Sequence, residues 1–60
     1  MYFKILKSKN NVNFYFVGYG NNHEPIFTSE MYTTKQSAKH TIEIIKAQAL
    51  EAPIKDESDN

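Results

Sequence analysis

The sequence predicts one small α+β domain with the element order β-β-β-α-β. Three segments near the N-terminus combine aromatic and β-branched residues and are separated by polar turns, which is typical of strands. Residues 38–49 repeat apolar side chains at helical spacing. Pro53 prevents a longer helix and favours extended backbone at Ala52. We therefore expect an antiparallel sheet with one helix packed on it.

The first two strands are predicted at residues 2–7 and 12–19, with the Asn-containing segment 8–11 as the turn of a hairpin. Side chains along a strand alternate between the two faces of a sheet. One face of this hairpin is therefore apolar, with Phe3, Ile5, Phe14 and Phe16. The other face carries a lysine, which indicates solvent, and three tyrosines: Tyr2, Lys4, Leu6, Tyr15, Val17 and Tyr19.

A third strand is predicted from Pro25 to Thr28, because proline fits the first position of a strand. Residues 20–24 form the turn before it, and Ile26 is its expected core residue. The segment 29–32 that follows is interpreted as a strand-to-helix junction, in which Ser29 bonds nearby backbone and Tyr32 covers the edge of the core. A ligand-binding role for this segment is the alternative.

The helix begins at Thr33 or Thr34, and Thr33 with Gln36 matches a capping box. One side of the helix forms an apolar stripe, with Ala38, Thr41, Ile42, Ile45 and Ala49, and the solvent side holds Lys39, Glu43 and Lys46. Ile44 lies off the apolar stripe, which indicates a second buried contact such as a subunit interface. The predicted core is Phe3, Ile5, Phe14, Phe16, Ile26, Ala38, Ile42 and Ile45.

After the helix, residues 52–55 predict a short edge strand, so the domain spans residues 1–55. Residues 56–60 are polar and acidic, and we expect them to be a disordered tail.

The small size of the chain predicts self-association. A single core in a domain of this length rarely supplies more than about 3–5 kcal/mol, so a disulfide, a metal or a partner subunit usually adds to it. The 60 residues include no cysteine, and His23 and His40 have no second ligand at zinc-like spacing. A partner subunit is what remains, although some domains of about 55–65 residues do fold alone.

Charge argues against a general polyanion binder. Seven basic and seven acidic residues give a formal net charge of zero, whereas nucleic-acid-binding domains usually carry a basic patch.

The sequence shows no sign of a targeting or membrane segment. The N-terminus has neither the apolar region nor the cleavage site of a signal peptide, and no apolar run approaches about 20 residues. We expect a cytoplasmic protein that does not enter membranes.

The chain resembles the YegP-like family, small bacterial domains of unknown function that occur singly or as tandem repeats. The resemblance covers Phe3 to Asp56. It rests on Phe3-x-Ile5, Phe14-x-Phe16, Ile26, Ser29-Glu30-x-Tyr32 and Lys35, and then on Ala38, Ile42, Ile45, Lys46 and Ala52-x-Ile54-x-Asp56. This sequence departs from the family in its longer second turn, residues 20–24, and in Pro53 at the start of the last strand. The resemblance implies that two β-β-β-α-β units form one sheet with exchanged C-terminal strands, so a single unit implies a homodimer.

The residues give no sign of catalysis, a metal site or a cofactor. Ser29, His23 or His40, and Asp56 are the types found in a catalytic triad, but no Gly-x-Ser-x-Gly elbow surrounds the serine. We expect a non-enzymatic interaction or accessory module. The alternative is a weak single-stranded nucleic-acid binder, in which bases stack on the sheet face that carries Tyr2, Lys4, Tyr15 and Tyr19. Ordinary sheet packing explains the same tyrosines without a ligand.

Overall fold

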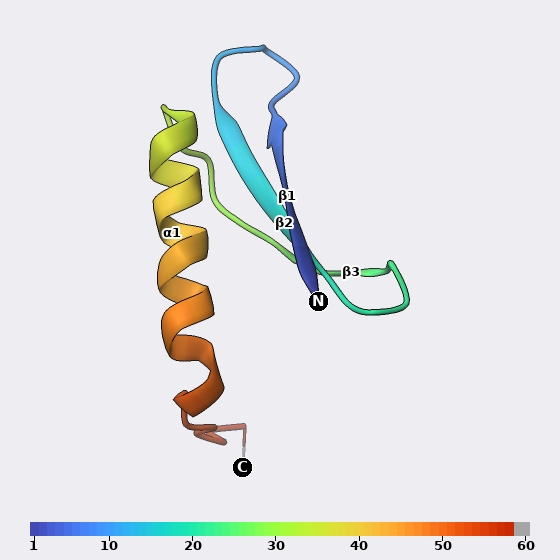
Figure 1. Cartoon of the computed structure of the whole chain (residues 1–60), viewed down its shortest axis with the longest axis vertical. Coiled ribbons are helices and arrows are strands. Elements are labelled where there is room, and N and C mark those ends of the chain that lie inside the picture. The colour runs from blue at the N-terminus through green and yellow to red at the C-terminus, as the bar shows by residue number, and fades with distance from the viewer. Residues whose placement is uncertain (59–60) are drawn as a thin grey trace.

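A computed structural model describes residues 1–58 and shows an α+β fold (Figure 1). The strands are β1 (Tyr2–Lys7), β2 (Phe14–Tyr19) and β3 (Pro25–Thr28). The helix α1 (Lys35–Gln48) follows and ends in a short 3₁₀ turn, η1 (Ala49–Glu51). The three strands form an antiparallel sheet in the order β1-β2-β3, and α1 packs against β1 and β2 on one side of it.

The hairpin of β1 and β2 confirms the predicted faces. Phe3 pairs with Gly18, and Ile5 pairs with Phe16, so these residues point toward α1. β2 begins two residues later than predicted, because residues 8–13 close a longer loop. Asn11 has a φ of 63°, and the Ser8 backbone N–H donates to the Asn13 carbonyl at 2.9 Å.

The third strand has the predicted bounds, but its predicted core residue is wrong. Ile26 is 62% exposed. A β-bulge between Gly18 and Tyr19 lets Gly18 pair with Phe27 and Tyr19 with Pro25, so Ile26 is the unpaired extra residue. Phe27 takes its place and packs its ring over Gly18, where a side chain would collide with it.

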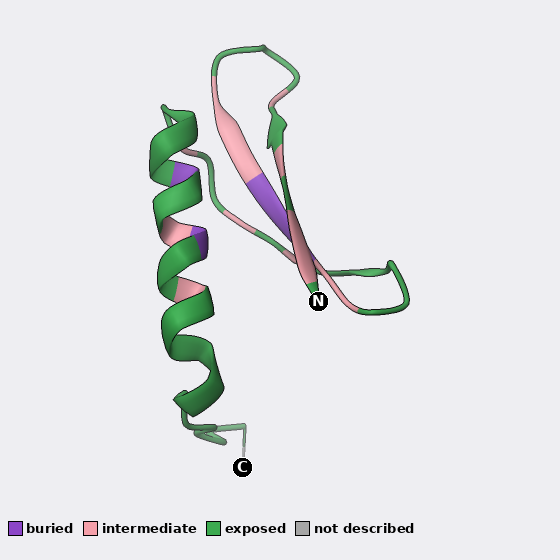
Figure 2. Cartoon of the chain, in the orientation of Figure 1, coloured by how far each residue is buried: buried purple, intermediate pink, exposed green. Residues whose placement is uncertain are grey.

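The core is small and lies between α1 and the centre of β2 (Figure 2). Phe16 and Ala38 are almost completely buried, and Ile42 lies beside them. Phe14 is only half-buried and lies outside this cluster, which is a further correction to the predicted core. The half-buried side chains that pack around the cluster are Phe3, Ile5, Phe27, Tyr32 and Ile45.

Contacts between aromatic rings stabilise this core. Phe16 meets Phe3 and Phe27 edge to face, with ring centroids 6.1 and 6.3 Å apart, and stacks on Tyr32 at 6.0 Å. Tyr32 also exchanges two backbone hydrogen bonds with Phe14, which fixes the chain between β3 and α1 against β2. This confirms that Tyr32 covers the edge of the core.

The helix start differs by one residue from the predicted capping box. Thr34 is the N-cap, and its Oγ1 accepts a hydrogen bond from the Ser37 backbone N–H at 3.0 Å. The pair Thr33 and Gln36 is therefore not the cap. Thr34 has the extended backbone that a cap requires, with φ −133° and ψ 153°.

The predicted fourth strand is absent from the single chain. Residues 52–58 form neither helix nor strand, and Ile54 is 96% exposed. The segment leaves the end of α1 without reaching a sheet edge (Figure 1), so its backbone has no ladder partner. The predicted disorder of residues 56–60 falls partly on 59–60, which lie outside the described residues.

The isolated chain is extended for its size. Its accessible surface is 5137 Å², whereas a compact monomer of 7.0 kDa exposes about 4,000 Å². Its radius of gyration is 13.5 Å, whereas a compact chain of this length has about 10 Å. The surplus surface includes several large apolar side chains, among them Leu50 and Ile54.

Candidate interaction surfaces

The outer edge of β1 is an uncovered sheet edge. β1 is the first strand in the sheet order, and β2 occupies only one of its two sides. The six residues of β1 contain no proline, whereas the opposite edge strand, β3, has four residues and begins with Pro25. Proline lacks the N–H that a ladder needs, so β1 is the edge better suited to accept another strand.

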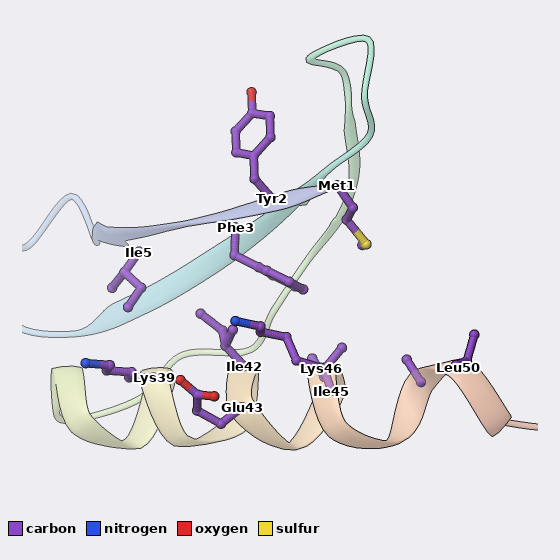
Figure 3. A pocket seen from close by; sticks show the side chains of 11 residues that line it. Met1, Tyr2, Phe3, Ile5, Lys39, Ile42, Glu43, Ile45, Lys46 and Leu50 are labelled. Carbon is purple, nitrogen blue, oxygen red and sulfur yellow. The ribbon is translucent and has the colours of Figure 1, made fainter.

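An apolar groove runs between this edge and α1 (Figure 3). Its volume is about 780 Å³, and it is lined by β1 on one side and by α1 and η1 on the other. Phe3 and Ile5 point into it from β1, while Tyr2 points away from it. From the helical side come Ile42, Ile45 and Leu50, with the charged residues Lys39, Glu43 and Lys46.

Several apolar side chains in the C-terminal half of the chain face solvent. Leu50, which lines the groove, is 94% exposed, and Ile54 in the following segment is 96% exposed. Ile44 on α1 is 41% exposed, so the second contact predicted for it is not made within one chain. Leu50 continues the apolar lining of the groove into solvent, and exposed apolar side chains that gather in one region are typical of an interaction site.

Register and alternation place the four predicted ligand-binding residues on the sheet face away from α1. Tyr2 lies opposite Tyr19, and their rings stack at a centroid distance of 4.9 Å with an interplanar angle of 4°. The Lys4 ammonium lies 5.2 Å from the centroid of the Tyr19 ring. Tyr2, Lys4 and Tyr19 therefore form one cluster.

His23 also belongs to this cluster, which the alternation of residues along the strands did not predict. The Tyr2 hydroxyl is hydrogen-bonded to His23 Nδ1 at 3.1 Å, and the two rings are 5.7 Å apart. His23 reaches this position because the 20–24 loop turns tightly, with a φ of 65° at His23 and a bond from its N–H to the Gly20 carbonyl. Alternation cannot predict the position of a loop residue, so the sequence carried no signal for it.

Tyr15 lies apart from the other two tyrosines. It pairs with Leu6 near the opposite end of the hairpin, four residues before Tyr19 on β2, with Val17 between them. It borders a shallow depression of about 470 Å³ together with Ser8, Lys9, Asn10 and Met31. The three tyrosines share a face of the sheet, but they do not form one continuous row of stacked rings.

The serine before the helix has a structural role. Ser29 Oγ accepts from the Phe16 backbone N–H at 2.9 Å and donates to the Glu30 carbonyl at 2.8 Å. The Ser29 N–H also donates to the Phe16 carbonyl, which continues the pairing beyond β3. The predicted role of Ser29 in the strand-to-helix junction is confirmed. Its hydroxyl donates its proton to the Glu30 backbone carbonyl.

Residues 1–58 contain no group of three or more metal-ligating side chains that could hold an ion. Within the same residues, no helix is long and apolar enough to cross a bilayer.

Comparison with known proteins identifies the family. No curated protein matches the chain. A family model described as a domain of unknown function (DUF1508) matches residues 6–56, which covers most of the chain and includes all of the helix. This agrees with the resemblance to the YegP-like family. The chain belongs to the DUF1508 family.

Proposed function

We propose that this protein is a non-enzymatic interaction module that acts as a homodimer, in which the C-terminal segment of each copy adds to the β1 edge of the other. The observation that carries the proposal is the open β1 edge beside an apolar groove. A strand that joins this edge makes backbone hydrogen bonds to β1 and places alternate side chains in the groove.

The surplus surface is about as large as one side of a standard protein–protein interface. The chain exposes roughly 1,100 Å² more than a compact monomer of its mass, whereas a standard interface buries about 800 Å² per partner. One interface of ordinary size would therefore remove most of the surplus.

The chain itself offers a suitable strand. Residues 52–58 form no regular structure, and the first of them follow a helix end that already lies beside the groove through Leu50. Ile54 is a β-branched residue and is 96% exposed in the single chain. The family resemblance implies the same exchange of C-terminal strands.

The chemistry of the groove supports binding rather than catalysis. Its floor consists of the aliphatic and aromatic side chains of Phe3, Ile5, Ile42 and Ile45, which suit the side chains of an added strand. Its charged residues, Lys39, Glu43 and Lys46, are exposed at the rim, where water screens them.

Light scattering of the purified protein tests the proposal. We expect twice the chain mass of 7.0 kDa at micromolar concentration, and monomer for an Ile54→Asp variant, because a carboxylate cannot enter an apolar groove without a large desolvation cost. Val12→Asp is the matched control, since Val12 is also well exposed at 64% but lies in the first loop. A wild-type monomer that stays folded on dilution would contradict the dimer, and a dimeric Ile54→Asp variant would contradict the strand exchange.

The alternative function is single-stranded nucleic-acid binding, favoured by the presence of Tyr2, Lys4, Tyr15 and Tyr19 on one open sheet face. Against it, Tyr2 and Tyr19 already stack on each other, and Tyr15 stands apart. A base that stacks between the first two would have to separate them.

A further inference from the structure

Two lysines stand at the rim of the groove. Lys39 and Lys46 are exposed residues of α1 that line the groove together with its apolar side chains (Figure 3). Glu43 lies between them on the same helical face, so the rim carries one net positive charge. An occupant of the groove with negative charge next to an apolar side chain would match this arrangement.

The C-terminal segment has this combination. Ile54 is followed by Lys55, Asp56 and Glu57. Side chains alternate along an extended strand, so Ile54 and Asp56 share one face while Lys55 and Glu57 share the other. A strand that places Ile54 on the groove floor therefore turns Asp56 toward the groove as well.

Asp56 is also held as an anion. Its Oδ1 accepts hydrogen bonds from the Ser58 hydroxyl at 2.6 Å and from the Ser58 backbone N–H at 3.1 Å. These bonds lower the pKa of the Asp56 carboxyl below its ordinary value. The carboxylate thus keeps its charge at any pH near neutral.

We propose that Lys39 and Lys46 of one copy recognise Asp56 on the C-terminal segment of a second copy, so that charge selects the partner strand. The inference rests on the homodimer proposed above and adds the residues that make its groove specific. Charged rims act mainly on specificity and on the rate of encounter, while the apolar floor supplies affinity.

A charge exchange between two variants tests this recognition. The first variant carries Lys39→Glu and Lys46→Glu, and the second carries Asp56→Lys. In either homodimer, groove and segment have the same sign, so we expect each variant to dimerise at least about tenfold more weakly than the wild type at low salt. In an equal mixture of the two variants, each C-terminal segment can bind a groove of opposite charge, so we expect a heterodimer to form.

Matched controls change the same kind of charge elsewhere. Lys35→Glu alters an exposed lysine of α1 that does not line the groove, and Lys55→Glu alters the opposite face of the segment. Neither change should weaken dimerisation as much as the reversed groove or the reversed segment. All the substituted positions are exposed, and circular dichroism of each variant checks that it folds.

A salt titration of the wild type gives an independent measurement. Between about 0.05 and about 0.5 M salt, screening shortens the range of charge interactions severalfold. We therefore expect the dissociation constant of the wild-type dimer to rise with salt, and the difference between wild type and charge-reversed variants to shrink.

The outcomes separate the two proposals. If the wild type and both variants dimerise equally, the homodimer stands and recognition by charge is wrong. If each variant is weakened but the mixture forms no heterodimer, the charges do not meet between copies, and the inference is also overturned. A wild type that is monomeric at every concentration removes the homodimer and the inference together.

Discussion

At the scale of single residues, Phe16 determines the stability of the domain. It is 1% exposed and contacts aromatic rings from three other parts of the chain. We predict that Phe16→Ala lowers the free energy of unfolding by about 3–5 kcal/mol, the usual cost of emptying a large aromatic site. Urea denaturation followed by circular dichroism measures this change.

Phe14→Ala is the control for this prediction. Phe14 points to the same face of the sheet but is half-buried and lies outside the core cluster, with the Lys7 ammonium 5.7 Å from its ring centroid. Its removal leaves a smaller cavity and should cost clearly less. Equal losses for the two variants would show that the core is not centred on Phe16.

Gly18 provides a second prediction at this scale. A Cβ at Gly18 would lie 2.7 Å from Cζ of the Phe27 ring, so Gly18→Ala forces that ring away from the core. We expect a loss of about 1–3 kcal/mol, as for other overpacked core sites. The measurement is the midpoint of chemical denaturation.

Gly20→Ala serves as its comparison. The nearest atom to a Cβ at Gly20 is the Asn22 side-chain oxygen at 3.1 Å, which belongs to an exposed loop and can move. A Gly18→Ala protein as stable as the Gly20→Ala protein would contradict the packing of Phe27 over β2.

At the scale of elements, the alternation of residues in β1 and β2 was sufficient to predict the hairpin and its buried face. Phe3, Ile5 and Phe16 point to α1 because period-two alternation leaves them no other face once Lys4 is in solvent. The same rule failed in β3, because the bulge at Gly18 and Tyr19 leaves Ile26 without a pairing partner. A glycine inside a strand pattern, such as Gly18, is a signal for a bulge. Which residue of the neighbouring strand the bulge leaves unpaired depends on how the two strands meet, and one strand's sequence does not contain that information.

For the candidate sites too, the sequence predicted part of the arrangement but not all of it. The sequence placed Tyr2, Lys4, Tyr15 and Tyr19 on one face, and the structure agrees on the face. It could not show that two of these rings stack on each other or that His23 joins them from a loop. The groove was also invisible, because it arises from how far α1 lies from the β1 edge and not from any local pattern.

The start of α1 gives a prediction for an element. Thr34→Ala removes the Oγ1 that accepts the Ser37 N–H, so we expect a loss of about 0.5–2 kcal/mol in the free energy of unfolding. Thr33→Ala changes a neighbouring exposed threonine that is not the cap and should have little effect. The reverse order of the two effects, measured by thermal denaturation, would restore the capping box predicted from the sequence.

At the scale of the whole molecule, the two candidate surfaces lie on opposite sides of β1. Phe3 and Ile5 point into the groove, whereas Tyr2 points to the face away from α1 (Figure 3). A strand added at the β1 edge would extend the sheet sideways without covering that face. The proposed homodimer therefore leaves the tyrosines accessible, and whether they bind nucleic acid is a separate question.

The net charge of the chain argues against binding to nucleic acid. Non-specific binding to single strands depends on lysines and arginines that attract phosphate, and the chain has a formal charge of zero. Lys4 lies on the tyrosine face, whereas Lys7 belongs by alternation to the face toward α1, with its ammonium near the Phe14 ring. A second copy would double this small positive charge and would also bring a second acidic C-terminal segment.

We therefore predict no measurable binding of a mixed-sequence single strand by fluorescence anisotropy at near-physiological salt. If the tyrosines were a stacking platform, each ring removed would cost about 1–3 kcal/mol of binding free energy, and affinity would fall steeply with salt. Tyr15→Ala is the informative variant, because Tyr2 and Tyr19 already stack on each other, whereas Tyr15 lies apart from them. Micromolar binding that weakens with salt and disappears in Tyr15→Ala would make nucleic-acid binding the better description of this face.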